Sequence, residues 1–250
     1  METQRTISEV FVPQPWLKSP TFHLNEGRLV WTAAILLAMM AGYLDGYGLL
    51  FLKTYVSFMS GNTTSTGVRS GQGDFHAAIP SAIAIVFFVA GSFLASSFLQ
   101  SKLRHAHRVV FALIAIGLAT IGGLEWINLH NVNFEIALLC LLMGMTNPAL
   151  SKIGAQAVSL TFMTGTLSRI GGHLASALGG KPPKDKQGPA VSHLVQAGID
   201  ASIWCGFLVG AVLAGLAGSN FRTWALLPPA LVMLALGLLS DRTAPSPEAI

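Results

Sequence analysis

SFMSGNTTSTG, residues 57–67, decides the fold, because a related stretch, LTFMTGTLSRIG, follows at residues 160–171. Four identical residues recur at a constant spacing of 104 residues: Phe58, Met59, Gly61 and Gly67. The apolar stretches that come after the two copies also match, FVAGSFLA at residues 88–95 and FLVGAVLA at residues 207–214. The chain is therefore composed of two related halves, and a polar motif inside each predicts a functional site where the halves meet.

The composition is that of a membrane protein. Of the 250 residues, 52% are hydrophobic and only 10% are charged, whereas soluble proteins have about 25% charged residues. Several apolar runs reach about 20 residues, the length that a helix needs to cross a hydrocarbon layer about 30 Å thick. The net charge of +4 comes from basic residues in the connections between these runs. We therefore predict an all-α protein whose partner is the lipid bilayer and not nucleic acid.

Six apolar runs are predicted to be transmembrane helices, at residues 29–52, 79–99, 109–127, 134–150, 198–217 and 224–239. The two polar motifs lie between such runs, so we expect each Met-Ser/Thr-Gly segment to be broken or re-entrant. An alternative count treats residues 55–68 and 153–178 as full spans, which gives eight helices. Residues 55–68 are too polar to favour that count.

The distribution of Lys and Arg predicts the topology. With the amino terminus inside and six spans, 12 of the 15 basic residues fall on the inner side and 3 on the outer side. Such a bias is typical of cytoplasmic segments, so both termini are expected in the cytoplasm of a bacterial cell with the spans in its inner membrane. The predicted organisation is a polar tail (1–28), repeat 1 (29–128), repeat 2 (134–240) and a second tail (241–250). Because each repeat has three spans, the repeats should be inverted.

Asp45 is the first candidate for a functional residue, because it is an acidic residue well inside an apolar run. An unpaired carboxylate there costs a few kcal/mol, so intramembrane acids often bind protons or cations. The alternatives are an Asp that reaches interfacial water and one that bonds a neighbouring helix. Arg169 is a basic residue from another segment that could pair with it. Two other acids, Glu125 and Asp200, lie near span ends and are expected to reach the interface.

Both motifs combine hydroxyl groups with a glycine, a pattern that suits a helix start whose free N–H groups face a cavity. The alternative is that these residues only pack helices together. We name as candidate binding residues Ser60, Gly61, Asn62 and Thr63 of the first motif and Thr164, Gly165 and Thr166 of the second.

Asn147, followed by Pro148, occupies nearly the place in the second half that Asp45 has in the first, and completes the candidate set. A proline-broken helix could expose a carbonyl group to a ligand, and a plain kink is the alternative. Small residues at four-residue spacing, such as Gly206, Gly210 and Ala214, indicate close helix packing. Of the scattered histidines, His173 closely follows the second motif.

The motifs resemble those of the YoaK-like family of bacterial membrane proteins. The resemblance rests on Gly42-Tyr43-Leu44-Asp45, Met59-Ser60-Gly61-Asn62, Gly144 with Asn147, and Met163-Thr164-Gly165, and it covers residues 29–239. The family is a group with a domain of unknown function. The resemblance implies a multi-spanning inner-membrane protein and implies no substrate.

These observations together predict a secondary transporter or permease for a small polar or anionic solute, or an ion, with a site at the repeat interface. The alternative is a non-transporting membrane scaffold or sensor. We expect no enzyme, no cofactor and no metal, because the sequence has no phosphate loop, zinc-ligand pair or nucleophile elbow.

Overall fold

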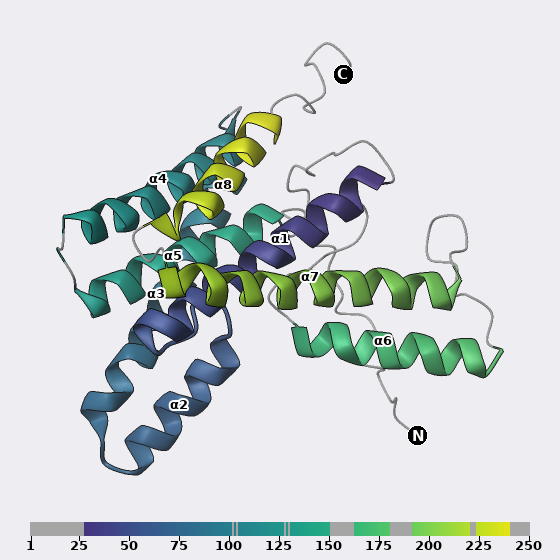
Figure 1. Cartoon of the computed structure of the whole chain (residues 1–250), viewed down its shortest axis with the longest axis horizontal. Helices are drawn as coiled ribbons and strands as arrows, with labels where there is room; N and C mark the ends of the chain where they lie inside the picture. Colours follow the sequence, from purple (N-terminus) through teal and green to yellow (C-terminus); the bar gives the residue numbers. More distant parts are fainter. Residues whose placement is uncertain are drawn as a thin grey trace, which may run out of the picture.

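A computed structural model describes residues 28–101, 103, 105–127, 129, 131–150, 163–180, 192–220 and 224–240. These residues form eight α-helices and one π-helical turn, as Figure 1 shows. The elements are α1 (Arg28–Tyr47), η3 (Gly48–Leu52), α2 (Met59–Gly71), α3 (Phe75–Gln100), α4 (Ala106–Trp126), α5 (Val132–Leu150), α6 (Met163–Leu178), α7 (His193–Asn220) and α8 (Leu227–Ser240). The predicted all-α membrane fold is confirmed at this level.

Among the described residues, five helices are long and apolar enough to cross a membrane: Ala34–Leu52, Phe75–Gln100, Ala106–Trp126, Val132–Ala149 and His193–Ala217. They correspond to the first five predicted spans. The sixth, α8, has 14 residues and is about 21 Å long at the rise of an α-helix, which is short of the hydrocarbon thickness. Pro228 and Pro229 lie in its first turn, where a missing N–H is tolerated.

The helix α3 begins earlier than predicted, at Phe75. Asp74 caps it, because its side chain accepts a hydrogen bond of 3.0 Å from the backbone N–H of Ala77. Such a cap satisfies one of the free donors of a helix start. The predicted start at residue 79 was too late because hydropathy alone does not detect a polar cap.

Each motif forms a separate short helix that folds against the long helix after it. The helices α2 and α6 have 13 and 16 residues, and they make antiparallel hairpins with α3 and α7 that point away from each other in Figure 1. The helix α2 is shorter than a span, which does not favour residues 55–68 as a full span. Of the second segment, 153–178, residues 153–162 lie outside the described part of the chain. The break predicted at the first motif lies in residues 53–58, before the helix.

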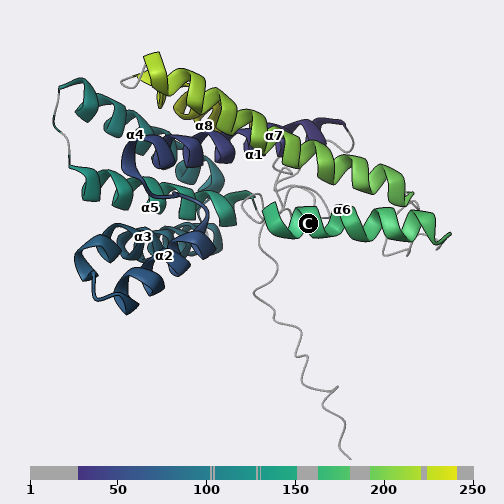
Figure 2. The same cartoon turned by 60° about the horizontal axis from the view of Figure 1, so that its bottom comes forward.

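The helices of the two halves are packed against each other. The most extensive packing joins α1 to α7 and α3 to α5, and α4 packs on α8. In Figure 2, α1, α7 and α8 lie above α5, and α2 and α3 lie below it. The candidate spans in α1 and α5 are 56% and 61% buried, against 22% in both α3 and α7. The first helix of each half is therefore central, and the long helix after the motif is peripheral.

The peripheral helices present large apolar side chains outward. Val86, Val89 and Phe93 of α3 are more than half exposed, as are Val212 and Leu216 of α7. In a membrane protein such a surface contacts lipid tails, so its exposure is the expected state.

Glycines bring α1 and α7 into backbone contact. A Cβ atom on Gly42 would clash with the carbonyl oxygen of Phe207, and one on Gly210 would clash with that of Met39. A close approach of this kind is possible only where a side chain is absent. The close-packing role predicted for the glycine ridge of α7 is confirmed.

The same arrangement joins α3 to α5. A Cβ atom on Gly91 would clash with the carbonyl oxygen of Leu141, and one on Gly144 would clash with that of Phe88. Gly144 corresponds to Gly42 and Leu141 to Met39, at a spacing of 102 residues. Gly91 corresponds to Gly210 and Phe88 to Phe207, at a spacing of 119 residues. The contact therefore occurs twice, with the roles of the two halves exchanged.

Candidate functional site

Asp45 is buried near the end of α1 and holds the chain that leads into the first motif. Its side chain is only 6% exposed. The backbone N–H groups of Val56 and Ser57 donate to Oδ1 over 2.9 and 2.7 Å, and the Ser57 hydroxyl donates to Oδ2 over 2.6 Å. Charge-assisted bonds of this length are stronger than neutral ones. The carboxylate therefore anchors residues 56 and 57 against α1.

A reversal of the chain makes this contact possible. After the π-helical turn η3, Lys53 adopts a left-handed conformation with φ 54°, and the N–H of Thr54 donates to the carbonyl of Gly48. A Cβ on Gly48 would lie 2.6 Å from the carbonyl oxygen of Thr54, so the return is close enough to require glycine. The first motif thus begins beside Asp45 and not beyond the end of the span.

Within the first motif, two of the predicted residues support the local structure. Asn62 is 2% exposed, and its Nδ2 donates to the carbonyl of Tyr55 over 2.7 Å. Gly61 leaves room for the ring of Phe58, which a Cβ would meet. Ser60 and Thr63 are exposed. The predicted role of these hydroxyls as ligands therefore gains no support from their placement.

The second motif is built differently. Thr166 is 1% exposed, and its hydroxyl accepts a bond of 3.3 Å from Nη2 of Arg169. Gly165 is half-buried and Thr164 is exposed, both in the first turn of α6. Asn147 is half-buried near the end of α5. It lies 102 residues after Asp45, the spacing that also relates the paired glycines of α1 and α5.

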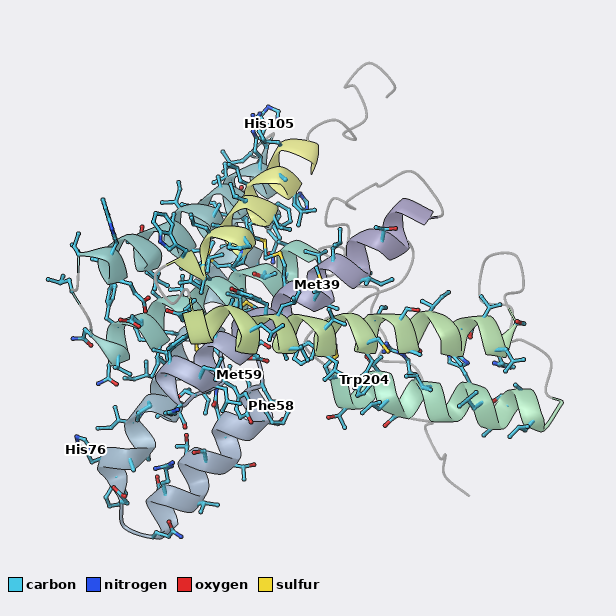
Figure 3. The ribbon with its side chains drawn as sticks, in the orientation of Figure 1. Met39, Phe58, Met59, His76, His105 and Trp204 are labelled. Atoms are coloured by element: carbon cyan, nitrogen blue, oxygen red, sulfur yellow. The ribbon has the colours of Figure 1, made fainter. Side chains whose placement is uncertain are left out.

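One cavity brings the two halves together beside Asp45. It has a volume of about 300 Å³ and is lined by Gly42, Asp45, Gly46, Leu49, Tyr55, Phe58, Met163, Phe207 and Ala211. Phe58 comes from the first motif and Met163 from the second. Figure 3 shows Phe58 and Met59 at the inner end of α2, and His76 at the far end of the same hairpin. Of the predicted binding residues, Asp45 is in the described lining, and the other eight are not.

The described lining shows what sequence reasoning missed. Three aromatic residues line the same cavity as Asp45: Tyr55, Phe58 and Phe207. The rings of Tyr55 and Phe58 pack edge to face with centroids 5.3 Å apart. None of the nine residues is basic. The cavity can therefore offer a negative or neutral acceptor and aromatic faces to a ligand.

Arg169 pairs with Asp200 and is thereby engaged on the α6–α7 hairpin, away from the predicted partner Asp45. Nη2 of Arg169 is 3.0 Å from Oδ1 of Asp200, and Nε is 3.2 Å from Oδ2. Asp200 is buried, with 9% exposure, so its carboxylate meets Arg169 inside the protein. The two residues face each other because α6 and α7 run antiparallel, and their spacing of 31 residues in the sequence does not reveal this.

Glu125 is also buried, with 4% exposure. It accepts a hydrogen bond of 2.7 Å from the hydroxyl of Tyr47. Tyr43 donates a bond of 2.6 Å to the carbonyl of Ala225. Tyr43, Asp45 and Tyr47 thus connect α1 to three separate segments.

Comparison with known proteins identifies a matching family and a similar protein, but no similar solved structure. A family model described as "Protein of unknown function (DUF1275)" matches residues 33–239. A protein of Rhizobium meliloti (strain 1021) described as a UPF0700 transmembrane protein is 29% identical over 203 residues, which is 80% of this chain and 81% of the relative. No solved structure matches the chain.

Proposed function

Because this chain belongs to the DUF1275 family of proteins of unknown function, and is a multi-spanning membrane protein, we propose that it is a secondary transporter. The observation that carries this proposal is the cavity beside Asp45, which takes lining residues from both halves of the chain. Sites at the interface of two repeats are the usual arrangement in such transporters.

We propose further that the halves are inverted repeats that exchange partners. The two matched glycine contacts support this, because α1 packs on α7 as α5 packs on α3. A twofold axis in the membrane plane relates such pairs in inverted-repeat transporters. Rocking of one pair against the other would then expose the cavity to the two sides in turn.

The lining of the cavity favours a small cation, such as an organic ammonium ion. A carboxylate attracts the positive charge, and the faces of Tyr55, Phe58 and Phe207 can add cation–π attraction. An anion would meet the Asp45 carboxylate with no basic residue in the described lining. The sequence alone pointed to a polar or anionic solute, and we now propose the cationic class of polar solutes.

Uptake into proteoliposomes tests the proposal. The purified protein is reconstituted and offered radiolabelled small ammonium compounds, neutral polar solutes and carboxylates, with and without a pH gradient. We expect gradient-dependent accumulation of a cation. Ala211→Trp should reduce it at least about tenfold, because an indole would fill the 300 Å³ cavity and leave no space in which a ligand could be buried.

The control is Val212→Trp, the next residue of α7, whose side chain is 54% exposed away from the cavity. It should transport as the parent does. Uptake that is unchanged in Ala211→Trp would exclude this cavity as the transport site. A folded protein that accumulates none of the solutes would instead favour the scaffold or sensor.

The topology makes a separate prediction. Reporter fusions at Ile250 and near Asn131 should indicate opposite sides of the inner membrane, with Ile250 in the cytoplasm, because 12 of 15 basic residues lie on the proposed inner side. Paired alkaline phosphatase and fluorescent protein fusions measure this. If both sites report the same side, the proposed inverted repeat is wrong.

A further inference from the structure

Two histidines from different helices meet on the α6–α7 hairpin. His173 lies on α6 and His193 is the first residue of α7, and their Nδ1 atoms are 3.2 Å apart. Both residues are half-buried, with ring centroids 5.5 Å apart. They sit one helical turn beyond the Arg169–Asp200 pair on α6, on the same seam of the hairpin.

The separation of the two Nδ1 atoms is close to that of two ligands on one metal ion. Two imidazole nitrogens bound to one tetrahedral Zn²⁺ at about 2.0–2.1 Å are about 3.3–3.4 Å apart, so the pair is already near this spacing and the rings must rotate to direct both nitrogens at the ion. Neutral imidazole is a preferred ligand for Zn²⁺, Cu²⁺ and Ni²⁺. The corresponding positions of the first half, at spacings of 104 and 119 residues, are Arg69 and Asp74, which cannot form such a site.

We propose that His173 and His193 bind one divalent transition-metal ion of the zinc class through their Nδ1 atoms, with water in the remaining positions. The ion joins the middle of α6 to the start of α7. Because α6 begins at Met163, which lines the cavity, the site fastens the second motif helix to its hairpin partner. Binding through both Nδ1 atoms requires each neutral ring to carry its one proton on Nε2, so the ring that donates Nδ1–H to the other changes tautomer when the ion binds.

Metal titration of the full-length protein tests the proposal. The protein is purified in detergent with an affinity tag that contains no histidine, stripped with chelator, and titrated with Zn²⁺ against a chromogenic chelator. We expect one saturable site. His173→Gln and His193→Gln should each weaken it by more than about tenfold, because even loss of a group that only supports a ligand costs about 10–100-fold.

The matched control is His76→Gln, an exposed histidine at the far end of the α2–α3 hairpin, which should bind as the parent does. Electron paramagnetic resonance of the Cu²⁺-loaded parent should show coupling to two imidazole nitrogens, and this readout needs no variant to fold. Equal affinity in the parent, His173→Gln and His193→Gln, or a spectrum with fewer than two nitrogens, would overturn the site.

Discussion

A single methyl group added at Gly42 should destabilise the protein strongly, whereas the same change at Gly171 should stabilise it slightly. A Cβ at Gly42 would clash with the backbone carbonyl oxygen of Phe207. A backbone atom of α7 cannot move aside alone, so α1 and α7 must separate along their contact. Overpacking a well-packed site costs about 1–3 kcal/mol and occasionally more, and we expect about 3 kcal/mol or more here.

Gly171 provides the matched control because a Cβ there meets nothing within 4 Å. It lies inside α6, where Gly→Ala gains up to about 1 kcal/mol of helix propensity. Thermal unfolding of the detergent-purified variants gives the comparison: Gly42→Ala should lower Tm by about 6 °C or more and Gly171→Ala should not, at roughly 2–4 °C per kcal/mol for a chain of this size.

The counterpart Gly144 extends this test to the other half. Gly144→Ala should match Gly42→Ala in its effect, because the carbonyl oxygen of Phe88 occupies the equivalent place. Similar Tm values for Gly42→Ala and Gly171→Ala would contradict the backbone contact between α1 and α7. A strong effect at Gly42 without one at Gly144 would contradict the equivalence of the two contacts.

The sequence predicted the long helices and their close packing well, because both follow from local composition. An apolar run of about 20 residues has to be a helix in a membrane, and repeated glycines indicate close approach. The sixth run, 224–239, was also predicted to within three residues, since α8 covers Leu227–Ser240 and starts with Pro228 and Pro229 in its first turn. The reversal at Lys53 escaped prediction, because it depends on a bond from Ser57 to Asp45, twelve residues back.

The candidate site was predicted only in part for a similar reason. Asp45 was identifiable as an acid within an apolar run, and the structure places it in the cavity wall. The hydroxyls of Ser60, Thr63 and Thr164 were expected to bind a ligand, but all three are exposed. In a helix made of small polar residues, composition does not indicate which face turns inward, so tertiary packing decides it.

Replacing Asp45 should separate its structural role from its proposed role in transport. In Asp45→Ala the N–H groups of Val56 and Ser57 lose their acceptor. Buried donors without partners cost about 1–3 kcal/mol each, so this variant should unfold at a much lower temperature or fail to accumulate in the membrane. Asp45→Asn keeps a carbonyl oxygen for the two N–H groups, and its amide can donate to the Ser57 hydroxyl.

Asp45→Asn should therefore fold and insert with a Tm close to that of the parent, yet lose gradient-driven accumulation, because an amide carries no charge with which to bind a proton or cation. Ser57→Ala is the matched control, because it removes one bond to Oδ2 and leaves the carboxylate in place, so it should lower Tm modestly and retain accumulation. The measurements are Tm in detergent and uptake in proteoliposomes on the same preparations. If Asp45→Asn accumulates solute against its gradient as the parent does, Asp45 is an anchor for the chain before α2 and has no part in coupling.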